Sequence, residues 1–146
     1  MSEIVLALDQ GCSSSRVLAF DSKGRVVARS QHAVGSFYPN PGFVEHDPAE
    51  LCRTTLRALD EVLDRLPGKS KVLAAGLAAQ RSTIVLWDAK TGRPACMAPS
   101  WMDGRAAESA AAMAGRQSEI HEKTGLYLTP YYSAPKIRWL LDHEPK

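Results

Sequence analysis

The stretch 4-IVLALDQGCSSSRVLAF-20 decides the fold, because one short polar segment separates two apolar runs. Residues 4–8 are continuously apolar and stop at Asp9-Gln10-Gly11, which predicts a fully buried strand that ends in a tight turn. Residues 17–20 predict an antiparallel partner strand. The polar residues 12–15 are therefore expected on a hairpin.

A third strand and a helix are expected next. After a turn at residues 21–24, residues 25–29 are again extended, which completes a three-stranded meander. Asp47-Pro48-Ala49-Glu50 predicts a helix start, with Asp47 as N-cap, Pro48 at the first position and Glu50 closing a capping box. An apolar stripe continues as far as Pro67-Gly68 and comprises Leu51, Leu56, Leu59, Val62, Leu63 and Leu66.

The second half of the chain alternates between extended and helical patterns. Residues 72–79 predict a buried strand, and residues 83–87 predict a hairpin strand that ends at a turn. Three helix-prone segments follow, at residues 105–113, 118–123 and 135–142. Strands with peripheral helices give an α/β or α+β class.

Composition excludes several classes of function. The 146 residues carry a formal charge of +2 with no run of five or more like charges, so we expect neither a nucleic-acid nor an acidic-lipid partner. The three cysteines form no C-x-x-C pair, which favours a reducing cytoplasm over an exported protein. The apolar run at residues 4–8 is too short for a signal segment or a membrane span.

The first hairpin, residues 9–16, is a candidate phosphate site. Gly11 permits a tight turn, and backbone N–H groups with the side chains of Cys12, Ser13 and Ser14 can surround phosphate oxygens. Arg16 can neutralise phosphate charge, and Asp9 at a strand end can hold Mg²⁺ through water. Taken alone, the same residues also fit an ordinary polar hairpin.

Two other patterns do not predict a phosphate or metal site. Gly68-Lys69-Ser70 matches the end of a Walker A motif, but the upstream glycine position holds Leu63 and a strand is expected to follow. The four histidines show no spacing typical of metal ligands.

A second candidate site would bind a polyhydroxylated molecule. Gln80-Arg81-Ser82 follows an apolar strand, where open sheets hold ligands, and Arg81 offers several donors. Trp101 and Tyr131 supply aromatic faces and Asp103 a carboxylate, a mixture suited to a carbohydrate. Each of these residues, taken singly, also fits core packing or a cap.

In this order the segments resemble the glycerol kinase branch of the FGGY carbohydrate kinases over nearly the whole chain. The resemblance rests on Ala7-Leu8-Asp9-Gln10-Gly11, Ser14-Ser15-Arg16, Pro41 to Pro48, Gln80-Arg81, Trp87-Asp88, Thr91-Gly92, Trp101, Thr124-Gly125-Leu126, Pro130-Tyr131 and Lys136. Several motifs in one order are more specific than any single one.

The resemblance implies an α/β fold of the actin-like ATPase (ribonuclease H-like) type, a mixed sheet with flanking helices. Such kinases close two domains over ATP-Mg²⁺ and a sugar or polyol, and transfer the γ-phosphoryl group to a hydroxyl. Residues 1–146 would be the N-terminal part of domain I, lacking the C-terminal nucleotide-binding domain. The catalytic base is expected beyond Lys146, so the isolated chain should be inactive, and the full-length enzyme could form a homo-oligomer.

The resemblance also assigns roles. Asp9, Ser13 and Arg16 would lie near the transferred phosphate, and Arg81, Trp101 and Tyr131 would line the acceptor pocket. Cys12 stands where the family usually has Thr, and Asp103-Gly104-Arg105 departs from the family's polar and basic residues.

Ser82 is the largest departure from the family pattern. It stands where glycerol kinases have a Glu that accepts acceptor hydroxyls. Loss of one charge-assisted hydrogen bond costs about 1.5–3 kcal/mol, so we expect an acceptor larger than glycerol.

Two alternatives remain open. The chain could be a noncatalytic binding or interaction module that kept part of a kinase fold. It could also belong to other actin-like ATPases, although the Gln80-Arg81, Trp101 and Pro130-Tyr131 cluster argues against families without a polyol acceptor.

Overall fold

The computed structural model describes residues 2–144, and the chain divides into two compact units. Unit 1 comprises Met1–Ser36 and Asp47–Gln80, and unit 2 comprises Phe37–His46 and Arg81–Lys146. Within residues 2–144, no helix is both long and apolar enough to span a bilayer.

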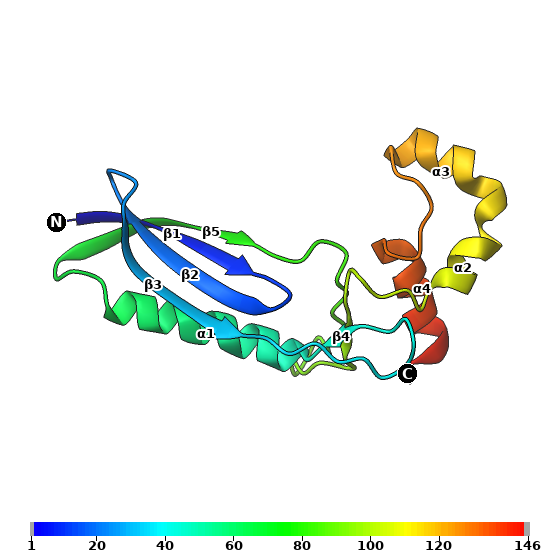
Figure 1. Cartoon of the computed structure of the whole chain (residues 1–146), viewed down its shortest axis with the longest axis horizontal. Coiled ribbons are helices and arrows are strands. Elements are labelled where there is room, and N and C mark those ends of the chain that lie inside the picture. The colour runs from blue at the N-terminus through cyan, green and yellow to red at the C-terminus, as the bar shows by residue number, and fades with distance from the viewer. Residues whose placement is uncertain (1, 145–146) are drawn as a thin grey trace. The chain divides into compact units, whose positions relative to one another are not determined.

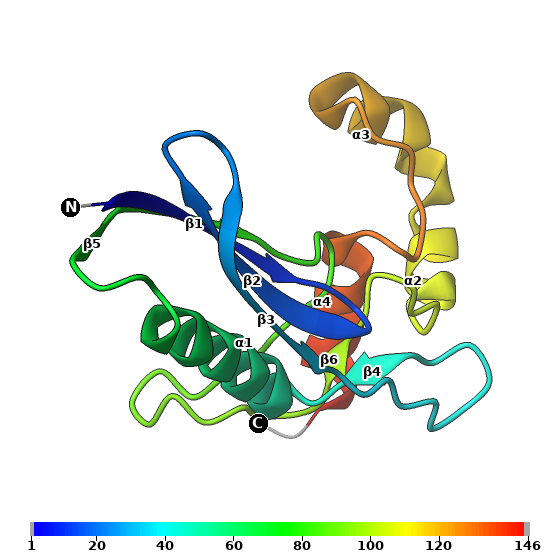
Figure 2. The same ribbon diagram turned by 60° about the vertical axis from the view of Figure 1, so that its left-hand side comes forward.

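Unit 1 is a mixed four-stranded sheet with one helix against one face (Figures 1 and 2). The sheet order is β3-β2-β1-β5; β1, β2 and β3 are antiparallel, whereas β1 and β5 run parallel. The expected meander is confirmed. The elements are β1 (Ser2–Gln10), β2 (Ser14–Asp21), β3 (Val26–Ala33), α1 (Pro48–Asp64) and β5 (Ser70–Ala78).

The core of unit 1 lies between α1 and the three antiparallel strands. Its buried side chains are Ile4, Leu6, Val17, Ala19, Ala28, Ala58 and Val62. The expected helix stripe is partly wrong, because Leu56 and Leu63 are 53% and 41% exposed. At about 100° per residue, Leu56 lies about 140° around the helix from Leu51, so Thr54 and Ala58 occupy the buried face instead.

The start of α1 is capped as expected at Asp47, whose Oδ1 accepts the N–H of Ala49 at 2.8 Å. Glu50, expected to close a capping box, instead accepts the backbone N–H of Gly35 at 3.0 Å. This bond fixes the segment that leaves β3 against the first turn of the helix.

The strand expected at residues 72–79 is confirmed as β5, but its expected burial is wrong. Residues 71–78 are exposed, with Leu77 at 66%. The reason is its place at the sheet edge: β5 pairs with β1 alone among the described strands, and α1 packs on β1, β2 and β3. An apolar run therefore predicted a strand without predicting what covers it.

Unit 2 contains several short helices and one small two-stranded sheet, joined by long irregular segments. Strand β4 (Glu45–His46) pairs antiparallel with β6 (Ala98–Pro99). The three expected helical segments are confirmed within a few residues of their predicted ends. The helices are α2 (Ala107–Ala112), the short 3-10 helix η1 (Ala114–Arg116), α3 (Gln117–Thr124) and α4 (Ser133–His143).

The strand expected at residues 83–87 is wrong, although its turn is confirmed. Gly92 donates its N–H to Asp88 O at 2.8 Å and has φ +69°, a backbone that favours glycine. Trp87 forms only an isolated bridge with Pro94. The bonds from Ala95 N–H to Leu86 O at 2.9 Å and from Asp88 N–H to Arg93 O at 2.8 Å hold this bridge. Ile84 N–H bonds instead to Pro99 O at 3.0 Å, so the pairing does not continue as a ladder.

Candidate functional site

The first hairpin turns through residues 11–13 between β1 and β2. Gly11 N–H donates to Ser14 O at 2.9 Å, and a Cβ at Gly11 would lie only 3.1 Å from that oxygen. A side chain at this position would therefore push against the backbone of the turn, whereas glycine permits the close approach. Val34 N–H donates to Ser13 O at 2.9 Å, which holds the turn against the end of β3.

The serines of the hairpin have different environments. Ser13 is exposed and Ser14 half-buried, so both hydroxyls remain near solvent. Ser15 is fully buried, and its Oγ lies 2.8 Å from Thr54 Oγ1 and 3.1 Å from Thr55 Oγ1 of α1. This hydroxyl cluster anchors the hairpin to the helix. Sequence reasoning missed it, although a threonine at helical spacing from Leu51 was its signal.

Asp9 and Arg16 face each other across the hairpin. Their side chains form an ion pair at 2.8 Å while each remains about half exposed, at 52% and 48%. Exposed pairs of this kind contribute only about 0–1 kcal/mol. Either partner can therefore exchange the other for a phosphate oxygen or a hydrated cation at little cost.

The hairpin offers one carboxylate to Mg²⁺, so it suits the cation only when a phosphorylated ligand binds with it. Among residues 2–144, no cluster of three or more His, Cys, Asp or Glu side chains is placed to hold a metal. Mg²⁺ keeps several waters and commonly takes one carboxylate plus substrate phosphates. The single carboxylate of Asp9 meets that requirement.

Gln80 joins this hairpin because β1 and β5 are parallel. Asp9 pairs with Ala78 in the ladder, so the carboxyl ends of both strands lie at one edge. The side-chain N–H of Gln80 donates to Gly11 O at 2.9 Å. The structure thus brings Gln80 to the phosphate candidate, and its expected role toward an acceptor stays a prediction.

In unit 2, the segment after Gln80 is tied to Trp101. Trp101 N–H donates to Thr83 Oγ1 at 3.0 Å, directly after Arg81 and Ser82. Ser82 has φ +67°, a left-handed conformation that costs a non-glycine residue free energy and is enriched at functional sites. Ser82 is therefore held in an unusual backbone geometry beside the predicted acceptor residues.

The two predicted aromatic contacts are both accessible. Trp101 is 45% exposed and Tyr131 is 50% exposed. Tyr131 lies just before α4, where its N–H bonds to Thr129 Oγ1 at 3.4 Å. Hydrogen bonds of the described residues link Trp101 with Thr83, but do not place Tyr131 beside them.

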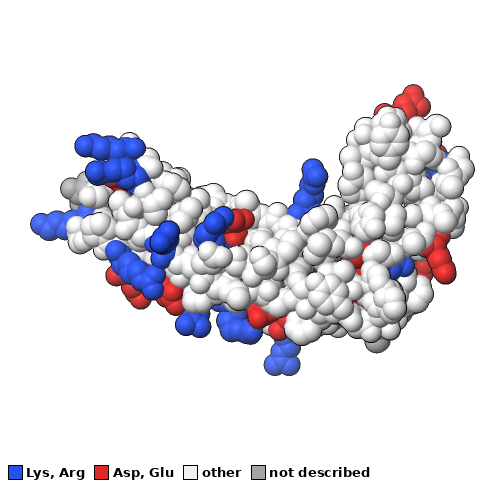
Figure 3. All heavy atoms as spheres, in the orientation of Figure 1, with Lys and Arg blue, Asp and Glu red and all other residues white. Residues whose placement is uncertain are grey.

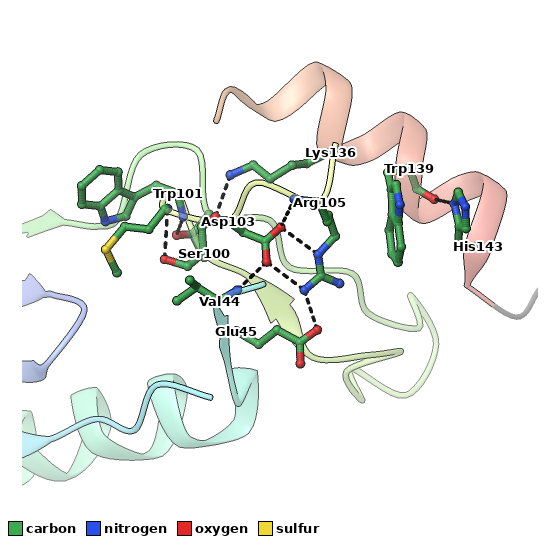
Figure 4. Close-up of polar contacts among 11 residues, drawn as sticks. Val44, Glu45, Ser100, Trp101, Asp103, Arg105, Lys136, Trp139 and His143 are labelled. Atoms are coloured by element: carbon green, nitrogen blue, oxygen red, sulfur yellow. Dashed lines mark hydrogen bonds and ion pairs between the residues drawn. The ribbon is translucent and has the colours of Figure 1, made fainter. Parts of the chain in front are cut away.

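Asp103 is buried in an ion cluster that comprises Glu45, Asp103, Arg105 and Lys136 (Figure 4). Its Oδ1 accepts Arg105 Nε at 2.8 Å, and its Oδ2 accepts an Arg105 N–H at 2.9 Å and Val44 N–H at 2.6 Å. Arg105 also donates to Glu45 Oε1 at 2.6 Å. The predicted acceptor contact of Asp103 is not tested by this geometry, which shows its carboxylate fully hydrogen-bonded within the protein.

Burial and neighbouring charges shift the pKa values in the ion cluster. Burial opposes the charge of Arg105, but the hydrogen bonds that Arg105 donates to Asp103 and Glu45 hold its pKa above the usual value. The guanidinium also lies over the rings of Phe43 at 4.3 Å and Trp139 at 4.9 Å. Burial lowers the pKa of Lys136 to about 8, with Asp103 opposing that change and Arg105 adding to it.

Sequence reasoning assigned no role to Arg105 or Lys136. Lys136 is completely buried and donates from Nζ to Ser100 O at 2.7 Å. A lysine within the apolar segment 135-PKIRWLL-141 was the available signal, because a buried cation requires a specific partner.

Comparison with known proteins identifies the class of this chain. The model of the FGGY family of carbohydrate kinases, N-terminal domain, matches residues 4–146, so the chain belongs to this family. A glycerol kinase from Symbiobacterium thermophilum is 46% identical over 144 residues, which cover 97% of this chain and 29% of that protein. The chain therefore spans less than a third of that relative.

Solved structures agree on the fold. The crystal structure of Plasmodium falciparum glycerol kinase with ADP has a TM-score of 0.90 at 30% identity, covering 99% of this chain and 29% of that one. Xylulose kinase from Rhodospirillum rubrum has a TM-score of 0.90 at 23% identity, covering 97% and 30%. The expected actin-like fold, a mixed sheet with flanking helices, is confirmed.

Proposed function

We propose that this chain is part of an enzyme that uses ATP to phosphorylate a hydroxyl of a polyol or sugar in the cytoplasm. Residues 1–146 would form the N-terminal part of its first domain. The observation that carries the proposal is the first hairpin, in which an exchangeable Asp9–Arg16 ion pair lies beside a turn fixed on several sides. A rigid turn with adaptable charges suits a phosphoryl group that changes its bonding during transfer.

The hairpin residues would bind and orient the phosphates. ATP with Mg²⁺ supplies the phosphoryl group and neutralises part of its charge. Arg16 would leave Asp9 to donate to phosphate oxygens, the exposed hydroxyl of Ser13 would add a hydrogen bond, and Asp9 would hold the hydrated cation. The backbone from Gly11 to Ser14 would stay fixed throughout.

The acceptor would lie at the residues of unit 2. Trp101 offers an exposed ring for the C–H face of a polyol, and Arg81 offers donors to hydroxyls. Tyr131 and Asp103 are the remaining predicted contacts. The short, neutral Ser82 favours a four- or five-carbon acceptor over glycerol.

We also propose that the catalytic base and the adenosine-binding domain lie outside residues 1–146. The support is that the chain spans 29% of the length of its glycerol kinase relatives. The chain alone is then expected to release no ADP in response to an acceptor. On the face drawn in Figure 3, basic side chains lie beside acidic ones, which is typical of a solvated surface. A homo-oligomer of the full-length enzyme is part of the proposal.

The test begins with the intact mass of the protein isolated from its source cells, followed by acceptor-dependent ADP release. A mass several-fold above 15.9 kDa with activity supports the proposal. A mass matching the 146 residues would favour a noncatalytic polyol-binding module. Acceptor-dependent ADP release by the 146-residue chain alone would contradict the proposed division of the site.

Matched arginine variants then test the hairpin in the active protein. Arg16→Gln should lower kcat/KM by about 10- to 100-fold, because a charge-assisted bond to the transferring group is lost. Arg25→Gln is the control, since Arg25 is also an exposed arginine paired with a carboxylate, that of Asp21 at 2.7 Å beside the β2–β3 turn. Equal losses in both variants would contradict a specific role for Arg16.

The acceptor class is tested by comparing glycerol with four- and five-carbon polyols. The larger polyols should have the higher kcat/KM, and Ser82→Glu should shift preference toward glycerol, because a carboxylate accepts hydroxyls more strongly. A clear preference of the unaltered protein for glycerol would overturn this part of the proposal.

A further inference from the structure

Residues of the ion cluster flank and contact a short loop, in which only Trp101 is well exposed. Ser100 and Asp103 are completely buried, whereas Trp101 between them is 45% exposed. Figure 4 shows the indole pointing away from Asp103 and Arg105. The loop therefore directs one aromatic face outward from a polar interior.

Hydrogen bonds fix the backbone on both sides of Trp101. On one side, Ser100 N–H donates to Val44 O at 2.8 Å, and Ser100 O accepts both Lys136 Nζ at 2.7 Å and Asp103 N–H at 3.0 Å. At Trp101 itself, the N–H donates to Thr83 Oγ1 at 3.0 Å. Little rotational freedom remains for the peptide units that carry the ring.

The charged side chains that make these bonds are costly to bury. Taking an ammonium or a guanidinium out of water costs several kcal/mol, which geometry and pairing must offset. A methionine at position 136 would fill similar space without that cost, but it could not donate to Ser100 O. The ion cluster thus provides orientation that apolar packing would not.

We propose that Lys136 and Arg105 are positioning residues that set the orientation of Trp101 for the acceptor. Lys136 acts through Ser100 O, and Arg105 acts through the Asp103 carboxylate, which in turn holds Val44 N–H at 2.6 Å. Through the Trp101 N–H, the same loop also holds the side chain of Thr83, which follows Arg81 and Ser82 in the chain. This inference rests on the proposed function, in which Trp101 contacts the polyol.

The orientation can be measured without any ligand. The chain would be labelled with 5-fluorotryptophan, and its three fluorine resonances assigned with single Trp→Phe variants. Lys136→Met should shift or broaden the Trp101 resonance and leave that of Trp87 unchanged. Lys123→Met is the control, because Lys123 is exposed on α3 and pairs only with Glu119 among its described contacts, at 2.8 Å. An unchanged Trp101 resonance in Lys136→Met would overturn the proposal.

A second measurement needs no variant and applies even if Lys136→Met fails to fold. In the unaltered chain, ¹⁵N relaxation of the indole N–H should show Trp101 as rigid and Trp87, which is 63% exposed, as more mobile. Equal mobility of the two indoles would overturn the proposal.

Polyol binding separates this inference from the proposed function. Titration of xylitol and glycerol would be followed on the Trp101 resonance, with a Kd at least about tenfold weaker expected in Lys136→Met. Equal affinity in both proteins overturns positioning while the acceptor assignment stands. If neither polyol shifts the Trp101 resonance of the unaltered protein, the acceptor assignment is overturned. The shift that Lys136→Met causes without ligand still measures the effect of Lys136 on the ring.

Discussion

The two units differ in what their interiors are made of. The core of unit 1 consists of aliphatic side chains between α1 and the sheet, such as Ile4, Val17 and Val62. The most deeply buried large side chains of unit 2 include Lys136 and Asp103, with Arg105 beside them. Aliphatic packing tolerates small changes in shape, whereas buried ions require each partner to be present. The units should therefore respond differently to substitution.

The largest effect is expected for Arg105→Leu in unit 2. This change removes the bidentate partner of a fully buried Asp103 and leaves an uncompensated carboxylate, at a cost of about 3–5 kcal/mol. Urea unfolding of the chain, followed by circular dichroism and tryptophan fluorescence, measures the loss.

The matched control is Arg116→Leu, also in unit 2. Arg116 forms an exposed bidentate pair with Glu119, so its loss should cost only about 0–1 kcal/mol. Equal free energies of unfolding for the two variants would mean that the ion cluster stabilises unit 2 no more than an exposed ion pair does.

The next effect is a pH dependence caused by Lys136. Its pKa is about 8 in the folded chain against an ordinary value of 10.5. Below pH 8 the amine is protonated in both states, and between pH 8 and 10.5 the unfolded state binds more protons. The free energy of unfolding should therefore rise with pH in this window, by at most about 3 kcal/mol.

Comparison with Lys136→Met isolates this contribution from other groups that titrate in the same range. The difference in unfolding free energy between the unaltered chain and Lys136→Met should change in favour of the unaltered chain from pH 8 to 10. A difference that is constant across that range would mean that Lys136 is not the group responsible.

Apart from the control Arg116→Leu, the smallest effect is expected for Ile4→Val in unit 1. Ile4 is completely buried in the aliphatic core, and loss of one methyl group typically costs about 0.5–1.5 kcal/mol. The same urea titration provides the value. A loss as large as that of Arg105→Leu would remove the contrast between the two interiors.

The sequence predicted most elements that depend on local patterns. The meander, the start of α1, the three helical segments of unit 2 and the turn at residues 88–92 all have local signals in capping, periodicity or glycine. It failed for residues 83–87, which form one isolated bridge before Ile84 N–H bonds to Pro99 O, a partner distant from the hairpin turn. It also failed for the exposure of β5, because burial depends on elements distant in the sequence.

The candidate site was predictable as a set of residues and only partly as a geometry. The pairing of Asp9 with Arg16 follows from hairpin register, which a turn between two strands indicates. The bonds from Lys136 to Ser100 and from Arg105 to Glu45 join residues far apart in the sequence. Periodicity reports one face of one element, so it gives no information on such long-range pairs.

The parallel pairing of β1 with β5 has a consequence for the order of folding. Strands β1, β2 and β3 pair with near neighbours, but Ser2 must find Ser70 before the fourth strand can join. Loop closure makes such long-range pairing slow compared with a hairpin. Because Gln80 lies two residues after the end of β5, its bond to Gly11 is expected to form only after that step. The first hairpin therefore acquires its complete set of bonds late, when the most distant pairing in unit 1 is made.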